Sequence, residues 1–321
     1  MISPWVVLQS VAWVYLLILA GVIARRSGLM PRASIEPIMQ VVYMLMLPCF
    51  IVDKILGADI LRSGGVVVSA LLCGFCLILG GVAVGGLVGK LIGLSRGNGI
   101  RTFALASGAQ NYGFTAMPVI DVLWCTAAMT GPLAVLFVHN IGVELALWSV
   151  GVMIVSGEQG IRWKRLCNGL VIGVVLGLLM VVCRIDHILD GPVRQSMHML
   201  GAGAFPLGIF IIGATIMDQL GDEKPSVKII SASLVTRLLL VPALFLVAAK
   251  YLPIADELRK VIVVQAAMPS AVTPIILARL YGGRTPIAVH IVIATTIASL
   301  FSLPWIISVG CWWIGLKPVL P

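Results

Sequence analysis

Long apolar runs without a single charge are the feature that most limits how this chain can fold. Residues 1–24 carry no charged side chain and lead into Arg25 and Arg26, and residues 63–89 are also free of charge. A membrane-spanning helix needs about 20 consecutive apolar residues. Only 11 % of the 321 residues are charged, whereas a soluble protein carries about a quarter. We therefore expect an all-α polytopic membrane protein.

Ten apolar segments are predicted as spans, separated by short connectors that contain glycine and proline. They lie near residues 5–24, 35–53, 65–89, 101–122, 130–155, 166–183, 196–217, 228–250, 260–280 and 286–314. Connectors of this size leave room for turns and for no soluble domain. In the first segment the positive charges follow the apolar run, whereas a cleaved signal peptide has them in front. This segment is therefore interpreted as a retained span.

The positions of lysine and arginine predict how the chain lies in the membrane. With ten spans, the larger share of these residues falls on the side that holds Arg25 and Arg26. The positive-inside rule makes that side cytoplasmic and places both termini outside, in a multi-pass protein of the cytoplasmic (inner) membrane with lipid around it. The net charge is +9, but the cations are scattered singly or in pairs. We therefore expect no binding to nucleic acid.

An odd number of spans in each half predicts an inverted repeat. The expected halves are residues 1–157, with spans 1 to 5, and residues 163–317, with spans 6 to 10. Two five-span halves enter the membrane in opposite senses, and such repeats hold their substrate near the bilayer midplane, where helices are interrupted. Pro48 in span 2 and Pro206 in span 7 occupy corresponding places in the two halves.

Prolines beside polar residues mark spans 4 and 9 as interrupted helices. Proline removes a helical hydrogen bond and obstructs a carbonyl group. In lipid, the freed backbone groups are tolerated only within protein or beside a wet cavity. Half-helix N-termini carry partial positive charge that suits a carboxylate, although ordinary proline kinks are the alternative. The expected substrate-binding residues are Gln110, Asn111, Gly113, Pro118, Gln265, Pro269, Ser270 and Pro274.

Four residues of spans 5 and 8 are candidates for ion coupling or charge pairing. Asn140 and Glu144 lie four apart on one helix face, next to His139. Arg237 is the one cation deep inside a predicted span. Ionisable side chains inside a membrane are expensive and mark functional sites. Glu144 and Arg237 are expected to pair, to bind substrate or to carry a proton, and the alternative is an ion pair that only fixes packing.

The remaining polar residues of the predicted spans are expected to have structural roles. His139 alone, and His290 likewise, are expected to be hydrogen-bonded core residues rather than proton relays. Asp53 and Asp121 close spans 2 and 4 and are expected at the membrane interface, in contact with water. Metal-ligand spacings and nucleophile motifs do not occur in the sequence. We therefore expect neither an enzyme nor a metal, catalytic residue or cofactor.

The residues around both breaks resemble the auxin efflux carrier family, which includes plant auxin exporters and bacterial malonate and malate carriers. The first half contributes Asn111-Tyr112-Gly113-Phe114 and Met117-Pro118. The second contributes Gln265-Ala266-Ala267-Met268-Pro269 through Pro274, followed by Ala278-Arg279-Leu280-Tyr281-Gly282-Gly283. The resemblance covers nearly the whole chain and is closest to the prokaryotic type.

This resemblance implies a fold similar to the bile-acid symporters, with spans 1, 2, 6 and 7 as a scaffold. Spans 3–5 and 8–10 would form a transport unit in which spans 4 and 9 cross at the substrate, with Asn111, Pro118, Pro269 and Pro274 matching the crossover. It also implies alternating-access transport of a small organic anion, a mono- or dicarboxylate, coupled to Na⁺, to H⁺ or to neither, and it allows a homodimer. Plant members carry a charged site on span 3, where this chain has Cys73-Gly74-Phe75-Cys76, so auxin itself is not favoured. The alternative is a membrane sensor or channel that binds a ligand without coupled transport.

Overall fold

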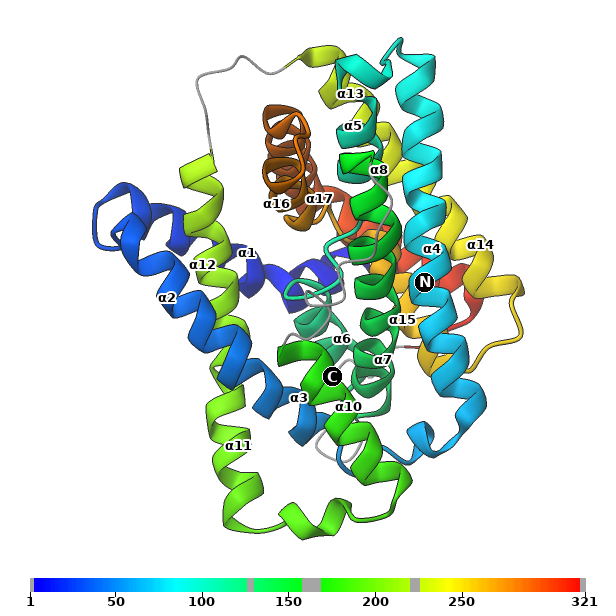
Figure 1. Ribbon diagram of the computed structural model, residues 1–321. Helices are drawn as coiled ribbons and strands as arrows, with labels where there is room; N and C mark the ends of the chain where they lie inside the picture. The colour runs from blue at the N-terminus through cyan, green and yellow to red at the C-terminus, as the bar shows by residue number, and fades with distance from the viewer. Residues whose placement is uncertain (1–2, 126–129, 158–168, 220–225, 318–321) are drawn as a thin grey trace.

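The computed structural model describes residues 3–125, 130–157, 169–219 and 226–317, and within these ranges every regular element is a helix (Figure 1). In the first half of the sequence the helices are α1 (Pro4–Arg26), α2 (Arg32–Val41), α3 (Leu47–Ile55), α4 (Gly64–Leu91), α5 (Ile100–Gly108), α6 (Ala116–Trp124), α7 (Gly131–Ala146) and α8 (Val152–Ser156). In the second half they are α10 (Gly169–Val182), α11 (Pro192–Ala202), α12 (Ala204–Gln219), α13 (Val227–Val235), α14 (Val241–Tyr251), α15 (Asp256–Ala267), α16 (Thr273–Leu280) and α17 (Thr285–Ile314).

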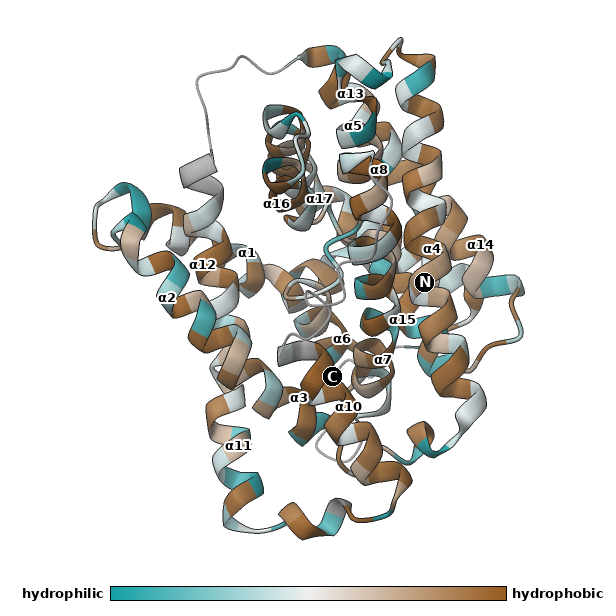
Figure 2. Cartoon of the chain, in the orientation of Figure 1, coloured by the Kyte–Doolittle hydropathy of each residue, from teal (hydrophilic) through white to brown (hydrophobic). Residues whose placement is uncertain are grey.

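Six helical segments in the described ranges are long and apolar enough to cross a membrane. They are Arg32–Ile55, Gly64–Leu91, Gly131–Ser156, Pro192–Thr215, Val227–Tyr251 and Thr285–Ile314. Large apolar side chains such as Leu72, Phe301 and Trp305 point outward from them and are exposed, and apolar residues cover most of the helices in Figure 2. These features confirm a multi-pass membrane protein. The expected boundary between the halves, residues 158–162, lies outside the described residues.

Three of the long helices contain a π-helical turn: η1 (Val42–Met46) joins α2 to α3, η4 (Leu147–Gly151) joins α7 to α8, and η6 (Thr236–Leu240) joins α13 to α14. Two of these turns end shortly before a proline, Pro48 and Pro242. A proline ring collides with the carbonyl group four residues earlier, and a wider turn relieves that collision. The helix therefore continues past each proline with a local distortion.

Helices pack most closely where glycines face a neighbouring backbone. A Cβ on Gly142 of α7 would collide with the carbonyl oxygen of Leu71 in α4, and a Cβ on Gly74 of α4 would collide with that of His139 in α7. Gly21 of α1 meets α12 in the same way. Small residues allow such close approach between helices in lipid, where packing replaces the hydrophobic effect as the force between them.

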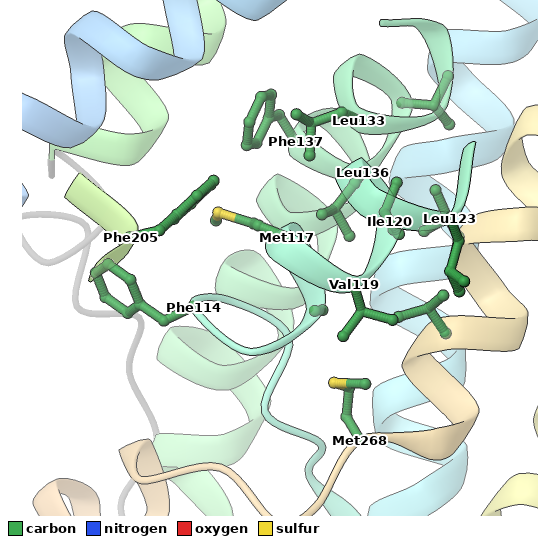
Figure 3. Close-up of a cluster of buried hydrophobic side chains, with 14 of the residues drawn as sticks. Phe114, Met117, Val119, Ile120, Leu123, Leu133, Leu136, Phe137, Phe205 and Met268 are labelled. Atoms are coloured by element: carbon green, nitrogen blue, oxygen red, sulfur yellow. The ribbon is translucent and has the colours of Figure 1, made fainter. Parts of the chain in front are cut away.

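The largest apolar core gathers α6 and α7 against α12 (Figure 3). Phe114 and Met117 face Phe205 of α12, and Phe137 of α7 lies on the same side. Met268 belongs to the same cluster and brings in the residues after α15. The core therefore holds in place the chain segments on which the candidate site is built.

The predicted solvated position of Asp53 is wrong. Asp53 is only 9 % exposed. One of its carboxylate oxygens lies 2.9 Å from His198 Nδ1, and the other lies 3.4 Å from Arg194 Nε. Arg194 also donates to the carbonyl oxygen of Leu56 at 3.0 Å. The three side chains join α3 to α11, so Asp53 is a packing residue. Asp121 is half-buried at the end of α6.

Candidate substrate site at two paired helix breaks

Two predicted spans are interrupted by extended residues. The first break, residues 109–115, separates α5 from α6, and the second break, residues 268–272, separates α15 from α16. The breaks pair with each other in an antiparallel bridge between Gln110 and Ser270. Asn111 N donates to Pro269 O at 2.7 Å, and Ala271 N donates to Ala109 O at 2.9 Å. Each break therefore satisfies backbone groups that the other one frees, as burial in a membrane protein requires.

The prolines of the candidate site do not all mark the point of interruption. Pro118 is buried in the first turn of α6, after the first break, and Pro274 is buried in the first turn of α16. Pro269 lies within the second break. Proline is favoured in a first helical turn because its missing N–H has no helical partner there. Pro118 and Pro274 therefore start the second half-helices.

Arg237 holds the ends of both first half-helices. Its guanidinium donates to Gly108 O at 3.1 Å at the end of α5, and to Gln265 O at 3.3 Å and Ala266 O at 3.1 Å at the end of α15. The residue is fully buried in the π-turn η6. Helix C-termini carry partial negative charge, so a cation is favourable there. The partial negative charge of these two helix ends therefore stabilises the buried guanidinium.

Glu144 accepts hydrogen bonds from two neutral side chains and not from Arg237. One carboxylate oxygen accepts from the Tyr112 hydroxyl at 2.7 Å, and the other accepts from Trp148 Nε1 at 2.7 Å. Within the described residues no ion pair joins Glu144 to Arg237. Of the expected roles for these two residues, a mutual ion pair is therefore wrong for this conformation.

Tyr112 connects the two halves of the chain at the first break. Its carbonyl oxygen accepts from Asn140 Nδ2 at 2.9 Å and from Gln265 Nε2 at 3.2 Å. Asn140 Oδ1 in turn lies 3.3 Å from His139 Nδ1 and 3.4 Å from Gln265 Nε2. His139 is thus buried and hydrogen-bonded, as expected. The network fixes the first break relative to α7 and α15.

Several polar atoms of the predicted site have no protein partner within the described residues. Both amide atoms of Gln110, Gln265 Oε1, Ser270 Oγ and His139 Nε2 are buried and unpaired. Buried polar atoms are nearly always hydrogen-bonded, and exceptions point to a ligand or to water. The unpaired atoms of Gln110 and Ser270 sit where the two breaks meet.

A main cavity of about 320 Å³ opens beside the breaks. One wall comes from α2, η1, α3 and α12, and the other comes from the two breaks, α6, α7 and α16. Asn111, Gly113 and Glu144 of the predicted residues line this cavity. Asn111 also borders a second, far smaller cavity on the side of Tyr15, and its Nδ2 donates to Thr115 Oγ1 at 3.0 Å.

The described lining of the main cavity is mostly apolar and includes no cationic side chain. Its two ionisable carboxylates are Glu144 and the exposed Glu36. The apolar and aromatic lining residues are Ile35, Met39, Tyr43, Leu47, Tyr112, Phe114, Met117, Ile212, Ala271, Val272 and Ile276. Asn111, Thr215 and Thr273, the last at the start of α16, add neutral polar side chains to the lining.

The remaining predicted residues support the site from behind. Gln110 and Ser270 are fully or almost fully buried at the bridge, and Gln265 is fully buried near the end of α15. Sequence reasoning missed Trp148, and it quoted Tyr112 and Thr273 only as parts of motifs. Trp148 follows Glu144 by four residues, the spacing that places two side chains on one helix face. The contacts of the Tyr112 carbonyl have no sequence signal, because they depend on how the helices pack.

A comparison with known protein families matches two parts of the chain to the same family model. A family model described as membrane transport protein matches residues 6–162 and again residues 153–307. Each match contains one of the two breaks. No curated protein matches the chain.

Proposed function

Because the chain belongs to this membrane transport protein family, of the auxin efflux carrier type, we propose that it is a secondary transporter that moves a small organic anion by alternating access. The observation that carries the proposal is the pairing of two interrupted helices beside a cavity. Broken helices at the interface between repeats are where transporters place substrate. The substrate residues are Asn111 and Gly113 on the cavity wall. They are supported by Gln110, Gln265 and Ser270, by Pro269 in the second break, and by Pro118 and Pro274, which start the helices after the breaks.

The proposed architecture has ten spans in two inverted halves. Spans 1, 2, 6 and 7 form a scaffold that contains α1, α2, α3, α10, α11 and α12. Spans 3–5 and 8–10 form the transport unit, with the two breaks crossing at the substrate. Two observations support this division: the family model matches each half separately, and the main cavity lies between helices assigned to the two units. Movement of one unit against the other would open the cavity to alternate sides.

The cavity favours a monocarboxylate with an apolar body over a dicarboxylate. Its described lining offers neutral polar side chains at Asn111, Thr215 and Thr273, carboxylates at Glu36 and Glu144, and apolar or aromatic side chains elsewhere, with no basic partner for a second carboxylate. The second carboxylate of a dicarboxylate would lie against apolar side chains, where an unpaired charge is expensive. A single carboxylate would face the starts of α6 and α16, whose partial positive charge suits an anion.

The charge of the cavity supports coupling to a cation. Glu144 lies in the wall without a basic partner among the described residues. A substrate carboxylate beside it would bring two negative charges together in a medium where their repulsion is strong. A proton shared with Glu144, or a sodium ion, would remove this repulsion. We place the protein in the cytoplasmic membrane with both termini outside, and a homodimer is compatible with this arrangement.

Ligand-induced stabilisation of the purified protein tests the site. A ligand that binds the folded state raises the melting temperature, so a screen of mono- and dicarboxylates identifies the class. We expect Asn111→Ala to weaken binding of the best ligand at least about 10-fold, since a hydrogen bond to a charged group contributes about 1.5–3 kcal/mol. Gln195→Ala, on an exposed face of α11, is the control and should bind normally. Unchanged affinity in Asn111→Ala would place the site elsewhere.

A further inference from the structure

A third cavity, of about 370 Å³, lies where three segments meet: the turn after α4, the start of α13 and the start of α17. The start of α13 and the end of α4 lie together at the top of Figure 1. This pocket, called the cationic pocket below, shares no described lining residue with the main cavity. It is therefore a separate candidate site.

Among the described residues, the pocket is lined by basic side chains and by no acidic one. Lys228, Arg284 and His290 face it, together with the polar side chains of Asn98 and Ser226. Within the described residues neither Lys228 nor Arg284 forms an ion pair with a carboxylate. His290 is only half-buried and belongs to this pocket, so the expectation that it is a core residue is wrong.

Arg284 is held in position by backbone contacts. Its amide nitrogen donates to Thr102 Oγ1 at 3.0 Å, and its Nη2 donates to Gly97 O at 3.3 Å. Gly99 has a φ of +89°, and a Cβ there would lie 3.3 Å from Arg284 Cδ and would collide with Ile287. The glycine thus allows the turn to lie against the arginine stem. A positioned guanidinium with free N–H groups is suited to a phosphate or a carboxylate.

The floor of the pocket is apolar, and exposed apolar side chains lie next to it in the sequence. Ile92, Ile229 and Ile287 line the pocket and pack on a buried cluster around Phe103. The neighbours of two lining residues, Leu91 and Val227, are 85 % and 78 % exposed. An anionic ligand bound here would have exposed apolar side chains beside it, as a phospholipid headgroup has at the surface of a bilayer.

We propose that the cationic pocket binds the phosphate group of an anionic phospholipid. Lys228 and Arg284 would contact the phosphate, and His290 and Asn98 would contribute hydrogen bonds. The acyl chains would leave along the exposed faces of α4 and α13. Basic pockets between membrane helices are suited to such headgroups. A free phosphate compound shares this chemistry, and the experiment separates the two sources. The inference does not depend on the transport activity.

Native mass spectrometry of the detergent-solubilised protein measures this binding directly. Dioctanoyl phosphatidylglycerol is titrated against dioctanoyl phosphatidylcholine and against inorganic phosphate. Each basic side chain near an anionic lipid contributes a factor of about 5 in affinity. We therefore expect Lys228→Gln to weaken phosphatidylglycerol binding about 5-fold and the double variant Lys228→Gln/Arg284→Gln about 25-fold. Arg96→Gln is the control, because Arg96 is exposed at the same end of the protein but does not line the pocket.

Preference of the protein for phosphatidylglycerol over phosphatidylcholine, lost in the double variant and kept in Arg96→Gln, supports the proposal. The single variant Lys228→Gln, at an exposed position, keeps the test valid if the double variant does not fold. Equal binding of both lipids, or unchanged binding in the Lys228 variant, overturns it. Displacement of the lipid by equimolar inorganic phosphate assigns the pocket to a free phosphate compound and overturns the lipid as its ligand.

Discussion

Tyr112 contacts both the main cavity and the hydrogen-bond network that holds the first break in place. Its hydroxyl donates to Glu144 on the wall of the main cavity, while its carbonyl oxygen accepts from Asn140 and Gln265 behind the break. A change at the Glu144 carboxylate therefore reaches the first break through one side chain. This contact gives a physical route by which the occupancy of the cavity and the charge of Glu144 influence each other.

Replacement of Glu144 by glutamine tests proton coupling at this residue. Glutamine keeps the size, its amide oxygen can still accept from Trp148 Nε1 and its amide NH₂ can donate to the Tyr112 hydroxyl oxygen, but it cannot exchange a proton with a substrate carboxylate. We expect Glu144→Gln proteoliposomes to take up substrate at a rate that no longer responds to a pH gradient, whereas the unchanged protein responds. Uptake of labelled carboxylate with and without the gradient is the measurement.

The matched control is Glu36→Gln, at the exposed end of the same cavity. It should retain the dependence on the gradient. If Glu144→Gln retains that dependence in full, protons are not coupled through this residue. Dependence on a sodium gradient in both proteins would instead identify sodium as the coupling ion.

At the scale of elements, the glycine contacts between α4 and α7 allow the sharpest prediction. We expect Gly142→Ala to lower the free energy of unfolding by about 1–3 kcal/mol, the usual penalty for an added methyl group in a filled core. The reason is that its Cβ would collide with the Leu71 carbonyl oxygen, which belongs to a rigid helix backbone. Thermal unfolding of the purified variant measures the change.

Gly65→Ala provides the comparison, since a Cβ there meets nothing closer than the Ser63 hydroxyl at 3.8 Å. Its melting temperature should equal that of the unchanged protein or exceed it, because alanine has the higher helix propensity. An equal melting temperature for the Gly142 and Gly65 variants would show that α4 and α7 are not in the close contact described.

Helix positions were predictable from sequence because lipid allows few alternatives. Each predicted apolar segment contains helical residues, including the described part of 166–183. The interruption of spans 4 and 9 was also predictable from proline beside polar residues. The exact ends of the breaks were not, because Pro118 and Pro274 begin the following half-helices instead of ending the preceding ones.

The partners of Arg237 could not be predicted for a different reason. Sequence offers one deep cation and one deep acid, which makes an ion pair the natural expectation. The structure instead supplies three backbone carbonyl groups from α5 and α15. Carbonyl groups are present at every residue, so a sequence contains no sign of which ones a packed helix end will leave free.

At the scale of the whole molecule, the family match on each half agrees with the pairing of the two breaks, because each half contains one of the two breaks. Each half contributes one interrupted helix, and neither break satisfies its backbone groups alone. Alternating access follows if the scaffold and the transport unit move past each other around that pair. A sensor or a channel would share the fold but would not carry substrate through an occluded state.

Counterflow in proteoliposomes tests the central claim of carrier transport most directly. Vesicles are loaded with an excess of the carboxylate identified by thermal shift, and the same compound is added outside at trace labelled concentration. A carrier exchanges inner for outer substrate, so labelled compound should accumulate transiently above its equilibrium level, and Asn111→Ala should abolish the overshoot. A monotonic rise to equilibrium, or no entry of label in vesicles that contain folded, ligand-binding protein, would contradict the account.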